Sequence, residues 1–140
     1  MTEDPVPEDE WKDASDPVEN PATPPRKRLY ANLLEFVETE LGPMYQRPID
    51  DDGRNLTWCP KWWRHREAML RLDVLWRAFE HLRHDGKTGL SEWLRDHVDH
   101  HMPILLDTNG PLHGCSPERG HVEGRVTGLV TDPPPEGLFD

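Results

Sequence analysis

The sequence predicts a mainly α-helical protein with a small three-helix core, an irregular C-terminal segment that leaves room for short strands, and a disordered Pro-rich acidic N-terminus. Three observations support this prediction. Apolar residues recur every three or four positions in three separate segments, clusters of glycine, proline and aspartate separate those segments, and both chain ends are rich in proline and acid. We therefore predict a tail over residues 1–28, a helical domain over 29–130, and a Pro-rich strap or tail over 131–140.

Charge is spread unevenly along the 140 residues, whose formal net charge is −11. Residues 1–25 contain eight acids, one lysine and six prolines, with too few apolar side chains to offset the entropy cost of ordering them. The acidic balance disfavours non-specific binding to nucleic acid or to an anionic membrane surface. Because no apolar run approaches the roughly 20 residues that span a bilayer, we expect no membrane association and a cytoplasmic location in a bacterial host.

The first helix is expected over residues 29–41. One face of it carries the apolar side chains Tyr30, Leu33, Leu34, Val37 and Leu41. Gly42 and Pro43 are expected to end it.

The central helix is the longest predicted element and is expected to run from Pro60 to about His84, since proline suits the first position of a helix. Two apolar stripes predict that neighbours cover much of its circumference. The first stripe contains Trp62, Met69, Leu72, Trp76 and Phe79, and the second contains Trp63, Leu70, Val74 and Ala78. His65 belongs to the first stripe, and we interpret it as a hydrogen-bonded core residue in preference to a ligand.

The third helix is predicted to begin at a Ser91 cap and to end or kink at Pro103. Its expected buried side contains Trp93, Leu94, His97, Val98 and His101. Beyond it, residues 121–130 suggest a short strand or hairpin, and the final segment is predicted to be an extended strap that docks Phe139 or a free linear motif.

Histidine and cysteine spacing predicts a structural zinc site. Two histidines four residues apart on a helix direct both rings to one point, and His97 and His101 have that spacing. Cys115 and His121 bracket a short loop, and Cys59 immediately precedes the central helix. These five residues are candidates for four ligand positions. Because no Cys-x-x-Cys pair is present, the alternative of ordinary histidines and two inert buried thiols stays open.

Enzyme motifs are missing from the sequence, which contains no glycine-rich phosphate loop, no Gly-x-Ser-x-Gly elbow and no His-Glu-x-x-His pair. Our first hypothesis is therefore a non-enzymatic accessory module that binds an unknown protein partner. The second, less favoured, is a nucleic-acid-associated factor that uses Arg26 to Arg28 and the arginines of the central helix. A third is an enzyme with a Cys115 nucleophile and a histidine base.

One stretch of the sequence resembles an uncharacterised actinobacterial family, the domain of unknown function numbered 4913. The resemblance spans roughly residues 29–139, and its most specific part runs from Trp58-Cys59-Pro60 to Trp76-Arg77-Ala78-Phe79-Glu80. It implies an actinobacterial or bacteriophage source and a gene on a plasmid or other mobile element, and it implies no activity. The family pattern includes the positions of Cys59, His65, His97, Cys115 and His121.

Overall fold

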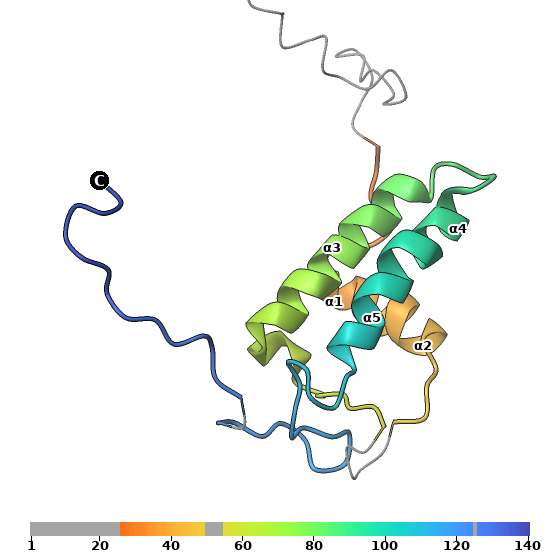
Figure 1. The fold of residues 1–140 in the computed structure, drawn as a ribbon. Coiled ribbons are helices and arrows are strands. Elements are labelled where there is room, and N and C mark those ends of the chain that lie inside the picture. Colours follow the sequence, from red (N-terminus) through yellow and green to blue (C-terminus); the bar gives the residue numbers. More distant parts are fainter. Residues whose placement is uncertain (1–25, 50–54, 125) are drawn as a thin grey trace, which may run out of the picture.

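The structure is a computed structural model that describes residues 26–49, 55–124 and 126–140 (Figure 1). Over these residues the protein is mainly helical, as the sequence predicts, and the long helix α3 packs against a helical run on either side of it in the sequence. The first 25 residues of the predicted N-terminal tail lie outside the described residues. No described helix is both long and apolar enough to cross a membrane.

The first helical run consists of α1 (Leu33–Phe36), a π-helical turn (Val37–Leu41) and α2 (Gly42–Met44). It begins later than predicted because Asn32 caps it, its side chain accepting a hydrogen bond from the Glu35 N–H at 2.9 Å. The prediction that Gly42 and Pro43 end the helix is wrong. Proline is tolerated in the first turn of a helical segment, and Pro43 occupies that position in α2.

The buried side of this run also differs from the predicted one. Phe36 is fully buried, whereas Leu34 is 49% exposed. In the π-helical turn, residues five apart share a face, and the fully buried pair Phe36 and Leu41 has that spacing. In a helix of 3.6 residues per turn, residues five apart do not share a face, so the apolar spacing could not predict that Phe36 and Leu41 are buried on the same side.

The central helix is shorter than predicted, because the chain breaks at His65. A 3₁₀ turn covers Trp62–Arg64, His65 has extended backbone angles of φ −104° and ψ 116°, and α3 then runs over Arg66–Leu82. The first predicted stripe is buried except for Met69, which is 38% exposed. The second predicted stripe is not covered, since Trp63, Leu70 and Val74 are 53%, 57% and 42% exposed.

The third helical run consists of α4 (Gly89–Glu92), a second π-helical turn (Trp93–Val98) and α5 (Asp99–Leu105). It begins at Gly89, where a Cβ atom would lie 1.8 Å from the Leu82 carbonyl oxygen, so only glycine allows this close approach to the end of α3. The helix continues through Pro103, which was expected to end or kink it.

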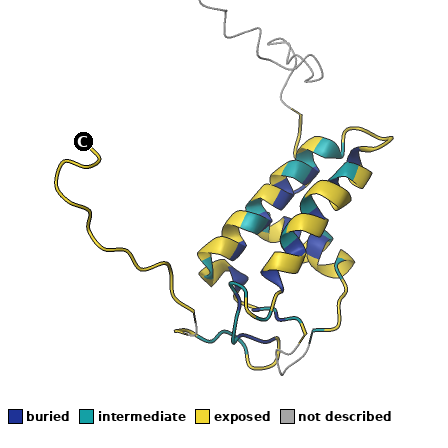
Figure 2. Ribbon diagram, in the orientation of Figure 1, coloured by how far each residue is buried: buried dark blue, intermediate teal, exposed yellow. Residues whose placement is uncertain are grey.

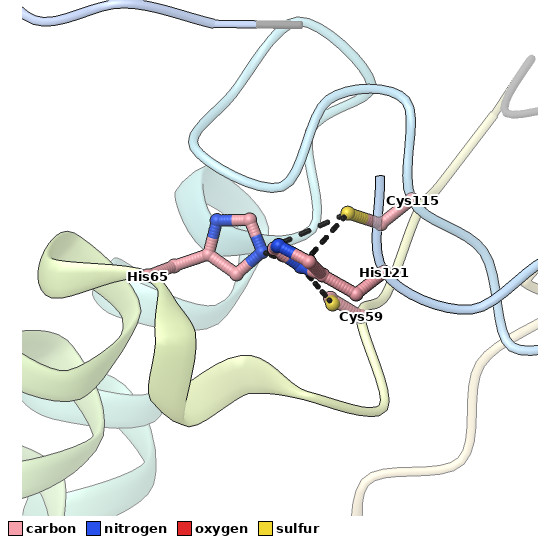
Figure 3. A group of neighbouring side chains, drawn as sticks. All are labelled: Cys59, His65, Cys115 and His121. Atoms are coloured by element: carbon pink, nitrogen blue, oxygen red, sulfur yellow. Dashed lines mark hydrogen bonds between the residues drawn. The ribbon is translucent and has the colours of Figure 1, made fainter. Parts of the chain in front are cut away.

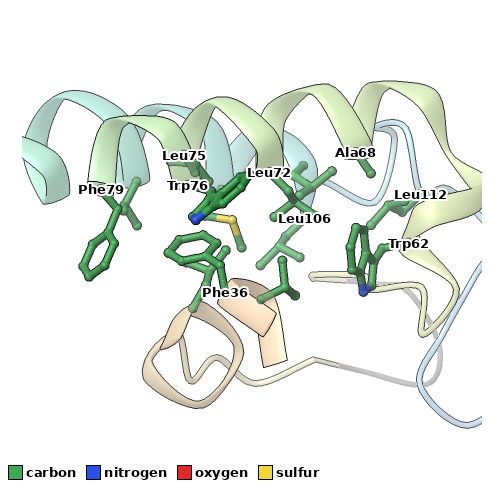
Figure 4. Packing of buried hydrophobic residues seen from close by; sticks show 14 of the residues in the cluster. Phe36, Trp62, Ala68, Leu72, Leu75, Trp76, Phe79, Leu106 and Leu112 are labelled. Atoms are coloured by element: carbon green, nitrogen blue, oxygen red, sulfur yellow. The ribbon is translucent and has the colours of Figure 1, made fainter. Parts of the chain in front are cut away.

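The buried residues of the three helical runs lie on the sides of the helices that face one another (Figure 2), and side chains of the three runs meet in one core (Figure 4). The Phe79 ring of α3 lies 5.5 Å from the Phe36 ring and 5.0 Å from the Trp93 ring, centroid to centroid. Trp93 also donates its indole N–H to the Leu75 carbonyl at 3.0 Å, which satisfies its buried polar atom. Aromatic packing therefore fixes the first and third runs against α3.

The C-terminal segment after α5 contains isolated bridges but no regular strand within its described residues. Leu56 bridges to Asp107, and Ser116 bridges to Gly120. The short strand or hairpin predicted within residues 121–130 is not formed in the described part of that range. Residues 126–140 are exposed, and Phe139 is 82% exposed, so the structure does not dock it on the domain.

Glu80 joins α3 to the segment that enters the first helical run. Its carboxylate accepts hydrogen bonds from the backbone N–H groups of Leu29 and Tyr30, both at 2.9 Å, and from the side chains of Trp76 at 3.3 Å and Arg83 at 3.1 Å. Burial pushes the pKa of Glu80 upward, but the hydrogen bonds outweigh burial and hold this pKa below its ordinary value of 4.5.

Replacing Glu80 by glutamine is expected to lower the free energy of unfolding at neutral pH by about 1–3 kcal/mol. The glutamine amide is neutral and has one acceptor oxygen, so it cannot accept all of the hydrogen bonds that the charged carboxylate accepts. Since the folded pKa lies below the unfolded one, the stabilisation by the carboxylate is present above pH 4.5 and is lost as the pH falls through the folded value. Urea unfolding at several pH values measures both effects. Glu38→Gln, at an exposed position, is the control, and a pH-independent difference would contradict the assignment.

Candidate metal centre

Cys59 and His65 lie on the short segment that leads into α3. The backbone N–H of Thr57 donates to the Leu106 carbonyl at 2.9 Å, and its buried hydroxyl donates to the Cys115 carbonyl. These bonds hold the segment against the chain that follows α5. Because the backbone of His65 is extended, this residue is not part of a helix, and its ring does not lie in the apolar stripe that the sequence pattern predicted.

Cys115 and His121 lie at the two ends of a tight loop. Ser116 and Gly120 exchange backbone hydrogen bonds of 3.3 and 2.8 Å, and the Ser116 hydroxyl accepts the Arg119 N–H at 2.9 Å. Gly120 has a φ of 80°, which a glycine adopts without strain. The loop therefore brings both of its ends to one side, as the sequence predicted.

Four potential ligand atoms meet where these segments converge (Figure 3). His121 Nδ1 lies 3.1 Å from His65 Nε2 and 3.3 Å from Cys59 Sγ. Cys115 Sγ lies 3.6 Å from His65 Nε2 and 3.9 Å from His121 Nδ1. All four atoms lie within 4.8 Å of one another, both cysteines are fully buried, and both histidines are partly buried.

Without a bound cation, burial of the group favours the neutral forms of Cys59 and His65. Burial, and then the charge of His121, lower the pKa of His65, while a backbone hydrogen bond to Pro111 opposes the shift. Burial, and then the hydrogen bond with Cys115, raise the pKa of the Cys59 thiol to about 11. A metal ion needs thiolates and unprotonated nitrogens, so its binding would release the thiol protons.

The donor set fits zinc. Bond lengths of about 2.0–2.3 Å in a regular tetrahedron place ligand atoms about 3.3–3.8 Å apart, and the four distances given above fall close to that range. Two sulfur and two imidazole donors suit zinc or another soft first-row metal, and they do not suit calcium or magnesium, which prefer oxygen. Four protein ligands fill a tetrahedral shell, as in structural zinc sites.

Three of the five predicted ligands, Cys59, Cys115 and His121, are brought together in this group. His97 and His101 do not belong to it. His101 Nδ1 instead lies 3.0 Å from an Arg71 nitrogen, and its ring packs against His100. The expectation that the third helix supplies ligands therefore fails in this structure.

The second π-helical turn explains why the pair His97 and His101 lies elsewhere. In an α-helix, these residues would share the face of Trp93. Because the turn over Trp93–Val98 has the longer π period, the next buried residue after Trp93 is Val98, five positions on, followed by Met102. Both histidines are thereby rotated to the margin of the buried face.

His65 is the ligand candidate that the sequence pattern misplaced, since we expected a core residue there. A repeated spacing could have found it. Cys59 and His65 are separated by five residues, and Cys115 and His121 are separated by five as well. Each Cys-x₅-His pair supplies one sulfur and one nitrogen to the group.

The fold and the site together define a small helical domain with a closed two-cysteine, two-histidine group. The chain belongs to the family described as Domain of unknown function (DUF4913), whose model matches residues 30–135. No curated protein and no solved structure matches the chain. The match covers all four residues of the group.

Substitution of single residues is expected to distinguish the histidines of the group from His97 and His101. His65→Ala or Cys115→Ser should abolish tight binding of cobalt, used as a coloured substitute for zinc, because each removes one of four donors. His97→Ala should leave the thiolate-to-cobalt absorption and the bound stoichiometry unchanged. Absorption spectra of titrated protein measure this, and loss of binding in His97→Ala alone would overturn the assignment of the site.

Proposed function

We propose that this protein is a zinc-stabilised, non-enzymatic interaction module. The observation that carries the proposal is the closed group of Cys59, His65, Cys115 and His121, whose ligand atoms lie within 4.8 Å of one another. The first two residues precede α3 and the last two follow α5. An ion bound there would cross-link the segment that leads into α3 to the chain after α5.

A structural role suits the part of the chain that the ion would hold. The segment after α5 has only isolated bridges and turns within its described residues, so regular hydrogen bonding contributes little to its order. Residues of this segment nevertheless enter the core, since Leu112 and Cys115 are fully buried. Metal binding would supply the free energy that orders such an irregular segment.

The geometry gives less support to catalysis. A catalytic zinc keeps one position for water or substrate, whereas four protein donors fill a tetrahedral shell here. A cysteine nucleophile must be accessible to its substrate, and both thiols are fully buried. We therefore favour a module that acts by binding.

The exposed C-terminal segment supports a protein partner. Leu129, Val130, Leu138 and Phe139 are 98%, 91%, 64% and 82% exposed. Apolar side chains of this size on an extended segment gain free energy when a partner covers them. The segment begins directly after the loop that carries His121, so the metal centre would anchor its origin.

The second candidate function, nucleic-acid association, has one supporting observation. The Arg83 side chain after the last residue of α3 donates to the Lys27 carbonyl at 2.7 Å, which brings Arg83 next to the segment that contains Arg26 to Arg28. Three of the other arginines proposed for this role give less support, because Arg64, Arg71 and Arg77 pair with Glu123, Glu67 and Asp73.

Removing zinc is expected to destabilise the protein by several kcal/mol, on the order of the contribution of structural zinc to small domains. Hydrogen exchange should accelerate mainly at residues 107–124, and less in α3, because the aromatic core remains. Melting curves and exchange before and after chelation measure this, with zinc re-addition as the control. An unchanged melting temperature in protein shown to have lost its zinc would contradict the structural role.

Double-stranded DNA is expected to bind weakly, and reversal of Arg26, Lys27 and Arg28 to glutamate should change the affinity little. The net charge of −11 opposes phosphate contacts. Fluorescence anisotropy at several salt concentrations is the measurement, and three reversals at Arg47, Arg77 and Arg95 are the control. Tight binding that weakens steeply with salt, and that only the first set of reversals abolishes, would favour the nucleic-acid function.

A further inference from the structure

We infer that Glu123, held by Arg64, is a positioning residue of the metal centre that makes His121 bind through Nδ1. The inference rests on the proposed function, because it concerns how the same four residues would hold the ion. It assigns a role to two residues that are not ligands.

The two ring nitrogens of His121 face different partners. Nδ1 points into the group, 3.1 Å from His65 Nε2 and 3.3 Å from Cys59 Sγ. Nε2 points out of the group and lies 3.4 Å from a Glu123 carboxylate oxygen. A neutral imidazole carries one hydrogen, and a ligand nitrogen must carry none. The hydrogen therefore belongs on Nε2, on the side of the ring where the Glu123 carboxylate lies.

His65 has the opposite arrangement. Its Nε2 faces His121 and Cys115, and a backbone hydrogen bond links the ring to Pro111. Proline has no N–H, so its carbonyl is the acceptor and the His65 Nδ1–H is the donor. The two histidines thus present different nitrogens to the group, and the other nitrogen of His121 faces the Glu123 carboxylate while that of His65 faces the Pro111 backbone.

Arg64 lies next to both histidines without being a ligand, because it pairs with Glu123 and is adjacent to His65 in the chain. Its guanidinium lies 3.2 Å from the same Glu123 oxygen that faces His121, and it directly precedes His65 in the chain. The Arg64 and Glu123 side chains are 46% and 67% exposed. An ion pair this exposed contributes little to folding. Its effect should therefore appear in metal binding and not in the stability of the metal-free protein.

The test is zinc affinity of the full chain, measured by competition with a chromophoric chelator. Glu123→Gln is expected to weaken binding about tenfold to a hundredfold, as loss of an outer hydrogen-bond partner of a ligand histidine does elsewhere. Glu123→Asp should recover part of the loss. Glu136→Gln, in the exposed C-terminal segment, is the matched control and should bind like the parent.

Two further readouts distinguish positioning from a general structural role. The melting temperature of the metal-free Glu123→Gln variant should equal that of the metal-free parent. In the parent loaded with ¹¹³Cd, nuclear magnetic resonance should show coupling from the metal to His121 Nδ1 and to His65 Nε2. Equal zinc affinities of parent and Glu123→Gln, or coupling to His121 Nε2, would overturn the inference while leaving the metal site intact. A parent chain without zinc affinity would instead overturn the proposed function.

Discussion

The meeting of residues 59–65 with residues 115–121 is the constraint on which the order of the chain after α5 depends. The helical core closes by apolar and aromatic contacts that the first and third helical runs make with α3. The irregular chain after α5 has no helix or strand within its described residues to order it. Its position follows from a few backbone bonds and from the four side chains that converge beside the start of α3. The proposed ion would join these four side chains by coordinating all of them.

Much of the fold could be predicted, because the spacing of apolar residues indicates which face is buried wherever a helix has 3.6 residues per turn. The prediction held for the first apolar stripe of α3, whose buried residues Leu72, Trp76 and Phe79 follow that period. It failed where the chain adopts a π-helical turn, since one additional residue per turn shifts every later side chain around the axis. The misplaced pair His97 and His101 in the third run has this cause.

The candidate site was predictable in part for a different reason. Cys115 and His121 are close in sequence, so a short loop suffices to join them. Cys59 was included because it immediately precedes the predicted central helix. His65 was missed because an uninterrupted helix from Pro60 would have buried it in the apolar stripe, and no residue between Pro60 and Arg66 signals the break in advance.

The separation of the two ligand pairs along the chain has a consequence for biosynthesis. Cys59 and His121 are 62 residues apart, and the sequences of α3 and α5 lie between them. A ribosome releases the first pair well before the second, so the helices can pack while only two donors are available. The centre is completed only when the loop after α5 has emerged. Capture of the ion would then act as the last step of assembly and select chains whose helical core is already formed.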